Sequence, residues 1–98
     1  MDAVTTLSAS KVRLAALGVQ LSARGFEAVL SGSVLKVVNP DEPGCCGRRL
    51  GDSITCRSRQ EDGGRLWFFT SWNEPIEPAD RVVDTGLRIQ GYLRASKR

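Results

Sequence analysis

The chain has 98 residues, of which 41% are hydrophobic and 26% are charged, and its formal net charge is +3. This composition predicts one small globular domain over residues 1–98, with a core that needs no disulfide or metal. No apolar run approaches the roughly 20 residues of a membrane span, and the N-terminus lacks the basic region of a signal peptide, so we expect a cytoplasmic protein. The sequence has no histidine, the commonest general base and metal ligand, which argues against an enzyme.

An amphipathic helix is predicted over residues 7–24, where leucines recur at spacings of three, four and seven. The leucine stripe is Leu7, Leu14, Leu17 and Leu21, and a second apolar stripe beside it is Val12, Ala16, Val19 and Ala23. Two short strands, residues 26–30 and 34–38, follow and are joined by a tight hairpin. We expect Asn39 and Pro40 to end the second strand, since proline cannot continue a ladder.

Residues 40–48 hold two prolines and two glycines and predict a loop. A third strand is expected from about residue 50 to 59, followed by a turn at 61–64 and an aromatic strand that begins near Arg65. Pro75 predicts a corner. A second helix is expected over residues 78–95, with Gly86 on its apolar face, where it would permit close packing.

This α-β-β-β-β-α order predicts an α+β fold, a four-stranded antiparallel meander with both helices on one face. The strands carry apolar residues on both sides. Toward the helices we expect Phe26, Ala28, Val34, Val38, Ile54, Leu66 and Phe68, and away from them Val29, Leu35, Val37, Trp67 and Phe69. A sheet with water on one side should alternate apolar and polar residues, so either a second copy or the 40–48 loop should cover the outer face. The sequence favours a homodimer.

The residues expected to form the surface for self-association or for a partner are Leu35, Val37, Trp67, Phe69 and Trp72. Two readings of Trp72 remain open at this point, a binding contact and a staple of the last helix to the sheet. For Ile76 the sequence favours the staple. A second surface combines Arg48, Arg49, Arg57, Arg59 and Arg65. It is predicted to be a solvated face, because acids dilute it, with direct nucleic-acid binding as the alternative.

Three cysteines and four carboxylates are the remaining candidates for chemistry. Cys45, Cys46 and Cys56 could make at most a three-thiolate site, and two of them are adjacent, so we expect free thiols, no metal and no cofactor. The carboxylates are Glu74, Glu77, Asp80 and Asp84. Acids gather at helix starts, so capping and surface charge are favoured over acid–base catalysis.

The run Trp67-Phe-Phe-x-x-Trp72-x-x-Pro75-Ile76-x-Pro78-Ala79-Asp80 follows a helix–hairpin opening that ends in Val37-Val38-Asn39-Pro40. Over nearly the whole chain this pattern resembles the BldB/AbaB-like family of small developmental regulators from Streptomyces. The adjacent cysteines at 45–46 and arginines at 48–49 are not features of that pattern.

The resemblance implies a small cytoplasmic α/β protein that self-associates and controls actinobacterial differentiation, including sporulation, or antibiotic production. It also implies action through a helix-turn-helix transcription regulator of the WhiJ type. The family has no established catalytic residues, so none is carried over.

Overall fold

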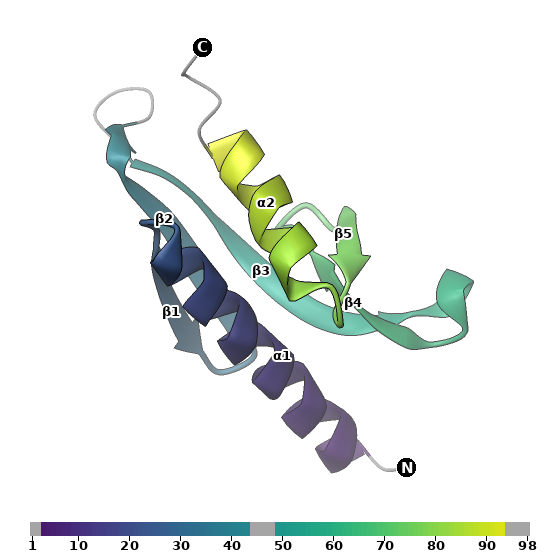
Figure 1. The fold of residues 1–98 in the computed structure, drawn as a ribbon. Helices are drawn as coiled ribbons and strands as arrows, with labels where there is room; N and C mark the ends of the chain where they lie inside the picture. The colour runs from purple at the N-terminus through teal and green to yellow at the C-terminus, as the bar shows by residue number, and fades with distance from the viewer. Residues whose placement is uncertain (1–2, 44–48, 94–98) are drawn as a thin grey trace.

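The computed structural model describes residues 3–43 and 49–93 of the chain. Its elements are α1 (Ala3–Ala23), β1 (Glu27–Ser31), β2 (Val34–Pro43), β3 (Arg49–Arg59), the short 3-10 helix η2 (Gln60–Asp62), β4 (Arg65–Phe69), β5 (Pro75–Pro78) and α2 (Val82–Leu93). The predicted α+β class is confirmed. The sheet is an antiparallel meander in the order β1-β2-β3-β4-β5, with both helices on one face (Figure 1).

The core lies between the two helices and the inner face of the sheet. The leucine stripe of α1 is fully buried at Leu14, Leu17 and Leu21. The other core residues are Phe26, Leu35, Val37, Ile54, Cys56, Phe68, Ile76, Ala79, Ile89 and Leu93. The second stripe of α1 is exposed, because it lies on the opposite side of the helix from the leucines. The apolar face of α1 that packs on the sheet is therefore narrower than its sequence suggests.

The sequence predicted the wrong set of β2 side chains to face the helices. Leu35 and Val37 are 1% and 0% exposed and belong to the core, whereas Val34 and Val38 lie on the outer face. The register explains this, because Leu35 pairs with buried Ile54. Since side chains alternate along a strand, Leu35 and Val37 cannot belong to the outer surface that the sequence suggested for self-association.

The region around the prolines also differs from expectation. β2 continues through Pro40 to Pro43, with a register shift after Asn39, so that proline does not end the strand. Residues Pro75–Pro78, predicted to be a corner and a helix start, form a fifth strand paired with β4. Its prolines are tolerated because β5 lies at the edge of the sheet. The last helix consequently begins at Val82.

Gly86 permits close packing of the two helices, as predicted. A Cβ atom at Gly86 would lie 3.1 Å from Nε of Arg24 on α1. Arg24 in turn donates from Nη1 to Oε1 of Gln90 on α2 (3.0 Å). At the other end of α2, Nδ2 of Asn39 donates to the carbonyl oxygen of Leu93 (3.2 Å) and ties β2 to the helix C-terminus.

A candidate interaction surface on the outer face of the sheet

The outer face of the sheet carries two arginines above two aromatic rings. Phe68 is buried under the helices, so its neighbours Trp67 and Phe69 point to the opposite side of β4, as predicted. Arg57 and Arg59 point to that same side of β3, because Arg57 pairs with Trp67 and Arg59 pairs with Arg65. We call Arg57, Arg59, Trp67 and Phe69 the arginine–aromatic face.

Each arginine stacks on the ring that lies diagonally across the strand pair. Cζ of Arg57 lies 4.2 Å from the ring centre of Phe69, and Cζ of Arg59 lies 4.4 Å from the ring centre of Trp67. Diagonal neighbours are within reach of such long side chains, and a guanidinium over a ring contributes about 0.5–1 kcal/mol at an exposed site. The stacked arginines cover the rings, so that Phe69 is only 9% exposed. This cover differs from both covers that the sequence suggested, a second copy and the 40–48 loop.

Hydrogen bonds hold this face in place. Arg57 donates from Nη2 to Oδ1 of Asn73 (2.8 Å) and from Nε to Oγ1 of Thr55 (3.3 Å). The indole Nε1 of Trp67 donates to Oδ2 of Asp62 in η2 (2.8 Å). Both ends of the face are therefore fixed, one by the β4–β5 loop and the other by the β3–β4 turn.

The β4–β5 loop places Trp72 in solvent. The loop is closed by backbone bonds from the Thr70 nitrogen to the Glu74 oxygen (2.9 Å) and from the Asn73 nitrogen to the Thr70 oxygen (3.1 Å). Asn73 takes the left-handed conformation at φ 68°, which asparagine tolerates better than most residues. Trp72 is 59% exposed, with Nε1 donating to Oε1 of Glu74 (2.8 Å). Trp72 is thus largely outside the core, whereas Ile76 is 7% exposed and packs in the core as predicted.

Two of the five arginines of the predicted basic surface, Arg59 and Arg65, have acidic partners. Arg65 lies 3.0 Å from Oδ2 of Asp80 and 3.6 Å from Oδ2 of Asp62, and Arg59 lies 3.7 Å from Oε1 of Glu61. The hydrogen bond from Arg65 holds the pKa of the Asp80 carboxyl below its usual value. Arg57 bonds only to neutral groups in the described part of the chain. Arg48 lies outside the described residues, and Arg49 begins β3.

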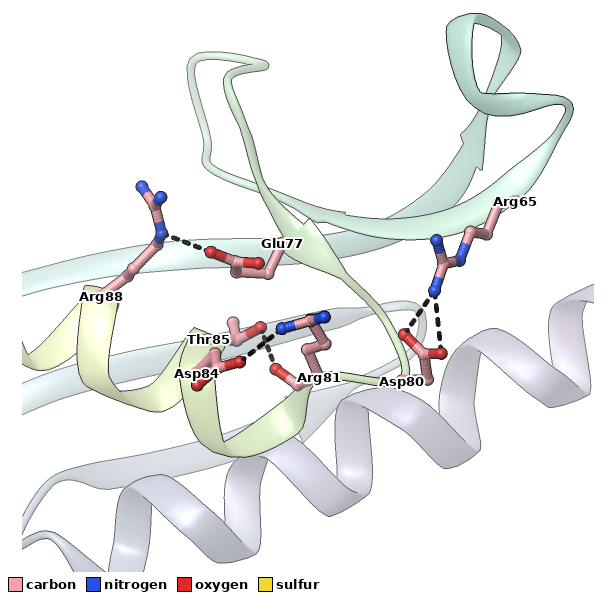
Figure 2. A network of polar contacts seen from close by, with 7 residues as sticks. All are labelled: Arg65, Glu77, Asp80, Arg81, Asp84, Thr85 and Arg88. Atoms are coloured by element: carbon pink, nitrogen blue, oxygen red, sulfur yellow. Dashed lines mark hydrogen bonds and ion pairs between the residues drawn. The ribbon is translucent and has the colours of Figure 1, made fainter.

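The four carboxylates of residues 74–84 are each matched to a different donor, as Figure 2 shows for three of them. Besides Asp80 with Arg65, Oε2 of Glu77 accepts from Nε of Arg88 (2.7 Å), and Oδ2 of Asp84 accepts from Nη1 of Arg81 (3.2 Å). Glu74 accepts from the indole of Trp72. This arrangement supports the predicted role in surface charge and does not bring two carboxylates together over one reacting atom.

The thiols show no catalytic arrangement in the described residues. Cys56 is free and 6% exposed, and burial raises the pKa of its thiol, although Ser10 and Arg13 act in the opposite direction. A raised pKa suppresses the reactive thiolate. Cys45 and Cys46 lie outside the described residues. Within residues 3–43 and 49–93, no group of three or more cysteine, aspartate or glutamate side chains is placed to hold a metal ion.

Neither helix in the described ranges combines the length and the apolar character that crossing a bilayer requires. No family model, curated protein or solved structure matches the chain.

Proposed function

We propose that this chain is a non-enzymatic regulatory protein that self-associates and binds a helix-turn-helix transcription regulator. The resemblance to the BldB/AbaB-like family suggests the WhiJ type of regulator and a cytoplasmic role in actinobacterial differentiation or secondary metabolism. The arginine–aromatic face is the single observation that carries the proposal of partner binding. Arginine and tryptophan are the residue types that most often dominate binding energy at protein interfaces.

The face also has the preorganisation that a binding surface needs. The guanidinium of Arg57 is held by Thr55, by Asn73 and by the ring of Phe69. Because these contacts already restrict its rotamers, little side-chain entropy remains to be lost when a partner docks. Its charge faces neutral partners, so an acidic patch on the bound protein would be the complementary surface. Trp72 is exposed in the neighbouring β4–β5 loop and lines a hollow with Ile76 and with Arg88 of α2, so it offers a second possible contact beside that helix.

Direct nucleic-acid binding is the weaker proposal. A duplex-binding surface needs several cationic side chains available to phosphates. Here Arg65 is shared by two aspartates and Arg59 has Glu61 nearby, which leaves Arg57 as the member of the arginine–aromatic face with no acidic partner among the described residues. The geometry therefore favours an acidic protein surface over a phosphate backbone.

The test is affinity capture from a nuclease-treated actinobacterial lysate, followed by reconstitution with the purified regulator. We expect one stoichiometric helix-turn-helix protein with wild type and at least about tenfold weaker binding for Arg57→Glu, because a like-charge contact opposes the complex. Arg81→Glu changes an exposed arginine in the helical layer and serves as the control. Equal binding by both variants would contradict the proposal, and a band shift of duplex DNA by the protein alone at low salt would favour the alternative.

A further inference from the structure

The two edges of the sheet differ in how far they can accept another strand. At one edge, β5 contains Pro75 and Pro78, which cannot donate to a ladder. At the other edge, β1 has no proline, and in the described part of the chain it pairs with β2 alone. Native sheets usually blunt such an edge with proline, an inward charge or a covering element. β1 is therefore the edge able to take a further strand.

The hairpin shows which backbone groups of β1 point outward. The β1–β2 connection has two central residues, with Gly32 at φ 63°, and Ser31 pairs with Val34. Residues that flank a two-residue turn form a hydrogen-bonded pair. Since such pairs alternate along an antiparallel ladder, Val29 is bonded to Lys36 of β2, whereas the N–H and C=O groups of Ala28 and Leu30 face the free edge.

Apolar side chains are exposed at this edge on both faces of the sheet. Val29 is 62% exposed on the outer face, and Leu30 is 37% exposed on the inner face beside α1. If the β1 edge faced only water, two exposed apolar side chains in succession would not stabilise the strand. Their exposure, together with the outward backbone groups, makes this edge suitable for pairing with a further strand that also carries apolar side chains.

We propose that β1 pairs antiparallel with β1 of a second copy, centred on Val29, so that two sheets join into one. This inference deepens the self-association in the proposed function and rests on it. In this register Ala28 lies opposite Leu30 of the other copy, which satisfies the outward backbone groups of both strands. Val29 lies opposite its own equivalent, where a non-hydrogen-bonded pair brings side chains closest.

The register is also free of charge conflict. Glu27 lies opposite Ser31 of the second copy, so no like charges oppose each other along the strand pair. A twofold axis perpendicular to the sheet places the α1 helices of both copies on the same side, which is also the side of the Ala28 and Leu30 side chains. The arginine–aromatic face lies on β3 and β4, two strands away from β1. The dimer thus leaves that face open for the transcription regulator.

Sedimentation equilibrium of wild type, Val29→Lys and Val19→Lys tests the proposal. Val29 neighbours Lys36 on β2, so V29K would place four lysines in one row across the dimer. We expect its dimer dissociation constant to rise at least about tenfold, because like-charge contacts oppose association. Val19 is similarly exposed, at 71%, but lies on the solvent side of α1, so V19K should associate like wild type. Circular dichroism checks that each variant is folded.

Cross-linking gives an independent readout of the register. In a background of Cys45→Ser and Cys46→Ser, mild oxidation of V29C should give a covalent dimer, since Cβ atoms of a directly opposed pair are about 4.5–5.5 Å apart. V19C in the same background should stay monomeric on a denaturing gel. The remaining Cys56 is buried.

The outcomes separate this inference from the proposed function. A wild-type dimer that V29K leaves intact would overturn the β1 pairing alone. A wild-type protein that stays monomeric at high micromolar concentration would overturn both the pairing and the proposed self-association. The binding of the regulator by the arginine–aromatic face is tested separately by Arg57→Glu.

Discussion

Replacing Leu35 by alanine should destabilise the monomer strongly and leave the surface unchanged. Leu35 is 1% exposed and pairs with buried Ile54. Its Cδ1 atom lies 3.3 Å from the point where a Cβ of Gly18 would be, so it packs against the α1 backbone with no intervening side chain. A backbone collapses into a cavity less readily than a side chain does. We therefore expect a loss of about 3–4 kcal/mol in the free energy of unfolding, well above the minimum for a buried leucine.

Urea unfolding, followed by tryptophan fluorescence at one fixed protein concentration, measures this effect. For a domain of this size the dependence on urea is about 1.5 kcal/mol per M, so the midpoint should fall by about 2 M. The matched control is Val34→Ala, one residue earlier, on the partly buried outer side of β2. It should lose only about 1 kcal/mol, since part of its side chain remains in water.

The comparison of the two variants decides whether Leu35 or Val34 faces the core. If Val34→Ala proved as destabilising as Leu35→Ala, or more so, the assignment of Leu35 to the core would be refuted. Weakened self-association without loss of monomer stability in L35A would have the same consequence, because it would return Leu35 to the outer surface.

Two further predictions concern the packing of the helices and the surface charges. Gly91→Ala should stabilise the protein by about 0.5–1 kcal/mol, because nothing lies within 4 Å of the new methyl group. Gly86→Ala should stabilise it less, because the side chain of Arg24 must move to make room for the methyl group. Equal gains of the two variants in urea unfolding would contradict the close approach at Gly86. Arg65 lowers the pKa of the Asp80 carboxyl in the folded state. The ionised Asp80 therefore stabilises the fold above about pH 4, and this stabilisation is lost as the pH falls through the lowered pKa of Asp80. The stability difference between wild type and Asp80→Asn should therefore shrink between pH 6 and pH 2 in urea titrations, and a constant difference would rule out this linkage.

The sequence predicted the order of the elements well because its turns are marked locally. Gly25, the Ser31–Ser33 hairpin and Gly63-Gly64 separate segments whose periodicity is clear. The short β5 was missed because its two prolines argue against a strand in every position except an edge. Edge position is a property of the whole sheet, and local sequence does not contain it.

The side of the sheet to which each β2 side chain points was harder to predict, because the strand carries apolar residues on both sides in the run Val34-Leu35-Lys36-Val37-Val38. One signal was available. Lys36 shares its side of the strand with Val34 and Val38, and a lysine at the centre of a strand prefers the solvated face. Giving that single charge more weight than the number of valines would have placed Leu35 and Val37 in the core.

The arginine–aromatic face combines two features that the sequence treated as separate surfaces. The short turn from Arg59 to Arg65 fixes the register that brings each arginine diagonally above a ring. The charge of the neighbouring Arg65 is compensated by Asp80, which is fifteen residues away and is brought close by the return of the chain through β5. Local pattern can suggest the stacking, but only the fold supplies the compensation.

The apolar outer face first suggested a dimer because its aromatic rings needed cover. The structure supplies that cover within one chain, since guanidinium groups lie over both rings. The reason to expect a second copy therefore moves from the centre of the sheet to its β1 edge. There Val29 and Leu30 are exposed beside backbone groups that have no strand partner in the described part of the chain. One surface is then available for self-association and a different one for the regulator, so each can be disrupted without the other.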